Sequence, residues 1–303
     1  MRVRSIVLAL GLAVAGCSSK AAPPPATPAP TTAAAPAPAP PALTLAQRSA
    51  LKRDGLTAYE RKDFATCARL LEQAADNYNA ACCYAQAGDR DRAFALLDRA
   101  ITVDDFSDQG HLAADPDLSP LHADPRWEAA GKTLAARAAE RRTRMNAELL
   151  QIYEDDQGDR RKPYDQIDWK QVTPRDQARR KRVDEIVASG SAKVADDYYH
   201  AAMVYQHGET GDEIQRARDL ALKAVELDPK HKSARWLAAA AEDRKLMYEG
   251  KPQKWGTQFK KIDGKWALWS VDGSVTDEQR EEWNVPPLAA AQARAEAMNQ
   301  RGR

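Results

Sequence analysis

Two segments of the chain, DFATCARLLEQAA (residues 63–75) and DRDRAFALLDRAI (residues 89–101), match each other at an offset of 26 residues. Both carry apolar residues at helical spacing, so that Leu70-Leu71 corresponds to Leu96-Leu97. Both also begin with an Asp, a residue that favours the start of a helix. The two segments are therefore predicted to be equivalent amphipathic helices.

A further helical stretch precedes each of these segments, at residues 47–61 and 78–88, and Gly88-Asp89 marks a turn. The order helix–turn–helix is thus repeated along the chain, and this repetition resembles tetratricopeptide repeats. The resemblance implies a stack of helix pairs in which each repeat contacts its neighbours.

The resemblance continues past the second repeat. Residues 101–130 are similar to the end-of-group element that caps such repeats, and DPDL at residues 115–118 and LHADPRW at residues 121–127 carry the similarity. The family more often has Arg in place of His122 and Phe in place of Trp127. Both replacements are expected to be tolerated.

A stack of amphipathic helices leaves an apolar face open at its end, which a capping segment has to cover. Leu118, Leu121 and Trp127 are the residues predicted to cover it. Because two repeats are few for a binding groove, two interpretations stay open for the repeat module. It is either a small structural module or a peptide-binding surface.

The second half of the chain is predicted to contain further helices. Apolar residues recur at helical spacing over residues 138–162, 168–190, 192–208 and 212–250. The second of these helices is expected to start at Thr173-Pro174, because Pro is favoured in a first helical turn. The stretch 212–250 is either a degenerate repeat or an independent helix pair.

The chain then changes character. Residues 256–271 alternate apolar and polar side chains about Asp263-Gly264, a dipeptide that favours a type I′ turn between two strands. A short polar helix is expected at residues 277–282, and Pro286-Pro287 separates it from a last helix. The predicted fold class is mainly α: tetratricopeptide-like helical repeats followed by a helical domain with one C-terminal β-hairpin.

Four short motifs occur in this half in the order Asp156-Gln157, Gln206-His207, Asp243-Arg244 and QKWGTQ at residues 253–258. Over about residues 145–290 they resemble a bacterial family known as a domain of unknown function (number 6624). Its typical members have Tyr where this chain has Trp255, and often Ala-Asp where this chain has Gly208-Glu209. The resemblance implies no particular activity.

These motifs supply the candidate site residues. His207 and Asp243 are the candidate catalytic residues, because a His beside Asp243 or Asp156 would form an acid–base pair. Arg244 suits a carboxylate or phosphate, and the Gln side chains suit a sugar, a peptide or an amide. The candidate binding residues are Arg244, Gln253, Trp255, Thr257 and Gln258.

The same residues also have a structural interpretation, which the sequence favours. His207 can cap the C-terminus of its helix, where a positive charge is favourable. Asp243 and Arg244 can form an ion pair, and Thr257 and Gln258 can bond the backbone of their own loop. Buried polar networks of this kind specify a fold without doing chemistry. An enzyme is therefore the less favoured alternative.

The first residues, MRVRSIVLALGLAVAGC, predict export. Arg2 and Arg4 precede an apolar run that is too short to span a bilayer, and small residues precede Cys17. This arrangement resembles a bacterial lipobox, which implies cleavage before Cys17 and acylation of it, palmitate included. The alternative is an ordinary signal peptide with a chance Cys. Ser18 at the next position resembles outer-membrane sorting.

A Pro- and Ala-rich tract follows Cys17 and continues to about residue 44, a composition typical of an extended tether. The predicted organisation is a signal peptide at 1–16, the lipidated Cys and tether at 17–44, the repeat module with its cap at 45–137, and the helical domain with its hairpin at 138–303.

Composition and cysteine usage narrow the choice of function. With 45 basic and 44 acidic residues the net charge is +1, which together with export argues against a nucleic-acid partner. Cys67 is expected either to pair with Cys82 or Cys83 or to stay a buried thiol, since an odd number remains after Cys17. No motif indicates a cofactor. His200 and His207 lie seven residues apart without a third ligand nearby, so no metal site is predicted.

We therefore expect a lipoprotein of the bacterial cell envelope, anchored in the outer membrane through Cys17 and facing the periplasm. Its first expected function is that of an interaction or assembly scaffold that holds another envelope protein. The alternative is a ligand-binding or hydrolytic domain that acts on cell-envelope material. It would do so through the polar set His207, Asp243, Arg244 and Gln258, with a small ligand as the partner.

Overall fold

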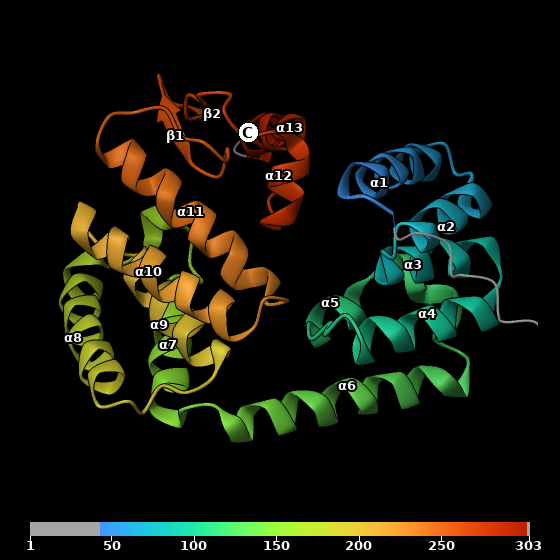
Figure 1. Ribbon diagram of the computed structural model, residues 1–303, viewed down its shortest axis with the longest axis horizontal. Helices are drawn as coiled ribbons and strands as arrows, with labels where there is room; N and C mark the ends of the chain where they lie inside the picture. The colour runs from blue at the N-terminus through green and yellow to red at the C-terminus, as the bar shows by residue number, and fades with distance from the viewer. Residues whose placement is uncertain (1–42, 302–303) are drawn as a thin grey trace, which may run out of the picture. The chain divides into compact units, whose positions relative to one another are not determined.

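The computed structural model describes residues 43–301. These residues are mainly helical, with one small antiparallel hairpin near the C-terminus, which confirms the predicted fold class (Figure 1). The predicted signal peptide, the candidate lipidation site Cys17 and nearly all of the tether lie outside the described residues. Within residues 43–301, no helix is both long and apolar enough to cross a membrane.

The first part of the fold consists of two antiparallel helix pairs that pack in sequence order (Figure 1). They are α1 (Leu45–Glu60), α2 (Phe64–Gln73), α3 (Asn77–Ala87) and α4 (Arg90–Thr102). Asp63 and Asp89 accept hydrogen bonds from the backbone N–H groups of Thr66 and Arg92, as expected of residues that start helices. Gly88 ends α3 with φ of 85°, which only glycine adopts without strain.

A capping segment closes this part of the core. It comprises α5 (Gln109–Ala114), the 3-10 helix η1 (Pro116–Leu121) and the start of α6 (Pro125–Arg144). Leu118 and Leu121 are fully buried and Trp127 packs half-buried beside them, in agreement with the prediction for the cap. The hydroxyl of Tyr59 donates to Asp117 and that of Tyr78 to Asp115, so α1 and α3 both hold the cap.

The second part of the fold is a group of helices that share another core. They are α7 (Ala147–Asp159), α8 (Trp169–Ala188), α9 (Ala195–Gln206), α10 (Gly211–Leu227) and α11 (Lys232–Tyr248). A single 3-10 turn, η2 (Tyr164–Gln166), lies between α7 and α8. Helix α9 packs against each of the other four, so its small residues Ala201 and Ala202 are fully buried. Leu149, Val183, Ile214 and Leu237 complete the centre of this core.

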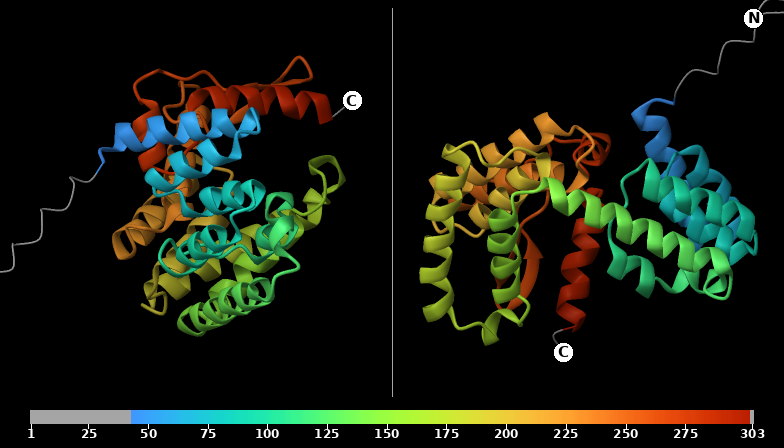
Figure 2. Two further views of the ribbon diagram at one scale, coloured as in Figure 1. Left: turned by 90° about the vertical axis from the view of Figure 1, so that its right-hand side faces the viewer. Right: turned by 90° about the horizontal axis from the view of Figure 1, so that it is seen from below.

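Two predicted helix boundaries in this part are wrong. Residues 138–162 do not form one helix, because α6 ends at Arg144 and Asn146 starts α7 by accepting a hydrogen bond from Leu149 N. The expected boundary between residues 137 and 138 consequently falls inside α6, which continues unbroken to Arg144 (Figure 2). Helix α8 begins at Trp169, so Pro174 lies within the helix and does not start it.

The C-terminal elements agree with the sequence pattern. Strands β1 (Phe259–Ile262) and β2 (Lys265–Leu268) pair antiparallel with Ile262 opposite Lys265. Asp263 and Gly264 have φ of 49° and 78°, as a type I′ turn requires. Helices α12 (Asp277–Glu282) and α13 (Leu288–Arg301) follow, and α13 lies beside β2 (Figure 2), where Asn299 bonds both backbone groups of Trp266.

Candidate functional site

Asp243 fixes the loop that leads into the hairpin. The residue lies on α11 and is 0% exposed. Its carboxylate accepts hydrogen bonds from the backbone N–H groups of Lys254 (2.8 Å), Trp255 (2.9 Å) and Thr257 (3.0 Å), and from the Thr257 hydroxyl (2.8 Å). Burial raises the pKa of Asp243 although these four hydrogen bonds oppose the rise. Both carboxylate oxygens are therefore occupied by the loop.

Gln253 and Gln258 close the same loop on itself. Gln253 donates to the carbonyls of Gln258 (3.0 Å) and Trp269 (2.8 Å) and accepts from the Gln258 N–H (2.8 Å). The Gln258 amide donates to the Ala240 carbonyl on α11, and its oxygen accepts from Arg244 Nε at 3.2 Å. Both side chains are buried, so these two predicted binding residues are used within the fold.

Arg280, which the sequence analysis missed, holds the other side of this loop. The residue lies on α12 and is buried. Its guanidinium donates to the backbone carbonyls of Trp255 (2.9 Å) and Lys254 (3.2 Å). Asp243 thus accepts hydrogen bonds from the N–H groups of the loop, and Arg280 donates hydrogen bonds to its carbonyl groups. Only the tertiary packing of α12 brings Arg280 here, and no local signal in the sequence indicates it.

Trp255 is the predicted binding residue at the edge of this arrangement. Its ring is partly buried, with the indole N–H donating to Glu242 at 3.0 Å and the ring centre 5.6 Å from that of Trp283. Burial alone would raise the pKa of Glu242, but hydrogen bonds from Lys254 and Trp255 lower it on balance. Trp255 therefore anchors the loop onto α11 together with Asp243.

His207 is paired with Asp156 and not with Asp243. His207 follows the last residue of α9, and its Nδ1 lies 2.8 Å from Asp156 Oδ2. Asp156 is 0% exposed and also receives hydrogen bonds from Gln157 (2.9 Å) and Arg160 (2.9 Å). The His207 side chain remains 20% exposed. Of the two carboxylates considered from the sequence, the packing of α7 against α9 selects Asp156.

Arg244 connects the two groups of residues. Its Nη1 donates to the backbone carbonyl of Gln206 at 2.7 Å, and its Nε donates to Gln258. Burial lowers the pKa of Arg244. The expected ion pair with Asp243 is not formed, because Asp243 is turned toward the loop. Arg244 therefore links the loop to the end of α9, where His207 pairs with Asp156.

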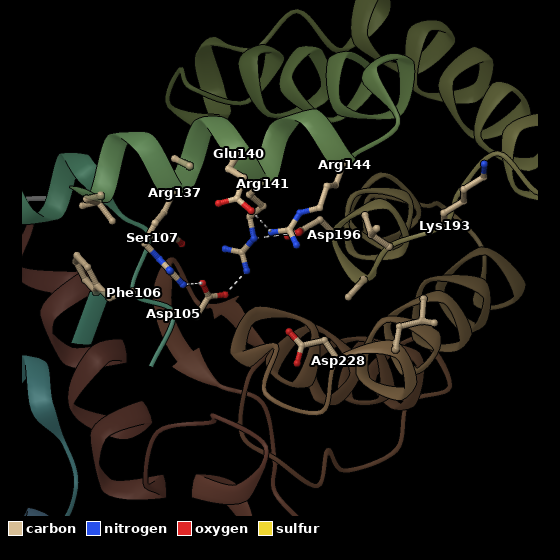
Figure 3. Close-up of a pocket in the computed structure, with 15 residues that line it drawn as sticks. Asp105, Phe106, Ser107, Arg137, Glu140, Arg141, Arg144, Lys193, Asp196 and Asp228 are labelled. Carbon is tan, nitrogen blue, oxygen red and sulfur yellow. Dashed lines mark hydrogen bonds and ion pairs between the residues drawn. The ribbon is translucent and has the colours of Figure 1, made fainter. Parts of the chain in front are cut away.

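A cavity of about 580 Å³ lies elsewhere, lined by α6, the segment at residues 105–107, and the ends of α9 and α10 (Figure 3). Arg141 extends across it and pairs with Asp105 and Asp196 (Figure 3). None of the predicted site residues lines this cavity. Among the described residues, no group of three His, Cys, Asp or Glu side chains could hold a metal ion.

No protein-family model, curated protein or solved structure matches this chain. The resemblances to tetratricopeptide repeats and to the family numbered 6624 therefore remain predictions.

His200 lies on α9, two turns before His207, and it is buried. Its ring stacks on Tyr153 with 4.4 Å between the ring centres. Burial lowers the pKa of His200 to about 4, and the nearby carboxylates of Asp196 and Asp197 only partly oppose this shift. His200 is therefore neutral in the folded protein near neutral pH.

We expect His200 to make the protein less stable in mild acid. In the unfolded chain its pKa returns to about 6.5, so its contribution is fully present above pH 6.5 and is lost as pH falls toward 4. Between about pH 7.5 and about pH 5 the free energy of unfolding should fall by about 2 kcal/mol through this group. Urea unfolding of His200→Gln should show a correspondingly smaller loss, and an equal loss would contradict the assignment.

Proposed function

We propose that this protein is a lipid-anchored interaction scaffold of the bacterial envelope. In this proposal Cys17 carries the lipid, the Pro- and Ala-rich segment is the tether, and the repeat module binds another envelope protein on the periplasmic side of the outer membrane. The observation that carries the proposal is an exposed apolar side chain, Leu56, beside a cavity in the repeat module.

This cavity has a volume of about 170 Å³ and lies between α1, α2, α3 and the cap. Leu56 at its edge is 51% exposed, while Tyr59, Asn79 and Asp117 provide polar groups and Cys82 provides part of the floor. An apolar floor with a few polar groups at the edge suits a single apolar side chain of a partner, with its backbone held by the polar groups. A partner segment of this kind is a short peptide stretch of another protein.

A photo-crosslinking residue placed at Leu56 of the full chain tests the proposal in the native membrane. We expect it to give one discrete adduct with another envelope protein, identified by mass spectrometry. The matched control is the same residue at Arg69, an exposed position on α2 that does not line the cavity. Adducts of the same pattern at both positions, or none at Leu56, would contradict the proposal.

The alternative function is that of a hydrolytic or ligand-binding domain acting through His207, Asp243, Arg244 and Gln258. The positions of these four residues support it less than the scaffold function. Asp243 and Gln258 are buried, and their polar atoms bond the loop and its neighbours. Such residues position a loop and do not touch a ligand. His207 and Arg244 are the two members of the set that are only partly buried.

A further inference from the structure

Arg244 differs from the arginines near it in having no acidic partner within residues 43–301. Arg160 and the arginines of α8 are each paired with at least one carboxylate: Arg160 with Asp156 and Asp176, Arg175 with Asp159, Arg179 with Asp159 and Asp176, Arg180 with Glu213, and Arg182 with Glu148. Arg244 donates only to two neutral oxygens, those of Gln206 and Gln258.

The positive charge of Arg244 is thus only partly compensated. The side chain is half-buried, and Arg160 lies close enough to lower its pKa further. The Gln206 carbonyl is at the C-terminus of α9, so it carries part of the negative end of the helix dipole. Such an end amounts to about half an elementary charge, which leaves an excess of positive charge at this point.

Two side-chain nitrogen atoms are also left over here. Neither Nη2 of Arg244 nor Nε2 of His207 has a hydrogen bond to any residue that the structure describes. Because Arg244 bonds the carbonyl of Gln206, its guanidinium lies next to the backbone of His207. The His207 and Arg160 side chains are 20% and 15% exposed, so solvent reaches this place.

We propose that Arg244 and His207 bind an oxyanion, the phosphate or carboxylate group of a ligand. The Nη2 of Arg244 offers charged N–H donors to such an oxyanion. With Nδ1 of His207 bonded to Asp156, the other ring nitrogen, Nε2, is the second contact for the same anion, since both ring nitrogens of an imidazolium are donors. Asp156 is then a positioning residue for His207. This site goes beyond the interaction function proposed above and does not depend on it.

Isothermal titration of the full-length protein tests this site, with inorganic phosphate and acetate as separate probes and sodium chloride to keep the ionic strength constant. We expect saturable binding of at least one of the two anions to a single site. Arg244→Gln should weaken this binding by about tenfold or more, since it removes a hydrogen bond to a charged group. The matched control is Arg175→Gln, a nearby exposed arginine that should leave the affinity unchanged.

His207→Gln is the second variant, and it keeps the test decisive if Arg244→Gln does not fold, as judged by circular dichroism. We expect His207→Gln to weaken anion binding less than Arg244→Gln does, by about threefold or more, because Arg244 stays in place. A preference for phosphate or for acetate identifies which kind of ligand group the site takes, and either preference supports the proposal. The absence of saturable binding to both anions would overturn it, as would an unchanged affinity in the folded variants.

Discussion

We expect Asp243→Ala to lower the free energy of unfolding by about 4 kcal/mol, a large share of the stability of an ordinary domain. The substitution removes the acceptor of three backbone N–H groups and of the Thr257 hydroxyl, at a position that solvent does not reach. Each buried donor left without a partner is costly, because it gave up its hydrogen bond to water on folding. Urea unfolding followed by far-ultraviolet circular dichroism measures the loss.

The control for this prediction is Glu242→Ala, the neighbouring carboxylate on α11. Glu242 is 21% exposed and bonds the side chains of Lys254 and Trp255, not the backbone of the loop. We expect its loss to cost about 1 kcal/mol or less, as is typical of partly exposed ion pairs. Equal losses in the two variants would mean that the backbone acceptor of the loop is not what makes Asp243 important.

The parts of the fold that sequence predicts well are those determined by neighbouring residues. Asp263-Gly264 predicts a type I′ turn because both residues tolerate positive φ, and both adopt it. The capping residues Asp63 and Asp89 indicate helix starts because their side chains reach N–H groups three residues along. The short helix at residues 277–282 has the bounds that its sequence indicates.

Sequence was less reliable where local preference and tertiary packing compete. Residues 138–162 have helix-forming side chains throughout, but Asn146 breaks the run by capping α7, and Asp197 on α9 accepts a hydrogen bond from its backbone N–H. The second contact joins residues 51 positions apart, which no local pattern reveals. Thr173-Pro174 predicts a helix start, whereas the packed helix continues through Pro174 from Trp169.

The candidate site shows the same division. Its members are predicted as short motifs in a fixed order, and the structure bonds the loop to Asp243 and Arg244. Arg244 also bonds the carbonyl of Gln206, and the next residue, His207, pairs with Asp156. The contacts between these members are not predictable from the sequence. The packing of α7 on α9 places Asp156 beside His207, and Asp243 accepts its hydrogen bonds from the loop. Arg280 was missed for the same reason, since its partners are carbonyl groups 25 and 26 residues away.

A disulfide joins Cys67 on α2 to Cys83 on α3, and removing it is expected to lower the free energy of unfolding by about 3 kcal/mol. The bridge closes a short loop, with 16 residues of sequence separation, and so reduces the conformational freedom of the unfolded chain. Both cysteines are buried in the core of the first part of the fold. The measurement is urea unfolding of the double variant Cys67→Ala/Cys83→Ala against the oxidised wild type.

Cys82 is the control, because the sequence left open which neighbour pairs with Cys67. Cys82 is a buried free thiol whose pKa is raised by burial and by the carboxylate of Asp115, so little thiolate is present to exchange with the bridge. Cys82→Ala should therefore cost only about 1 kcal/mol, the packing of a small side chain. A loss equal to that of the double variant, or a Cys67–Cys82 peptide found by mass spectrometry, would show that Cys82 holds the bridge instead.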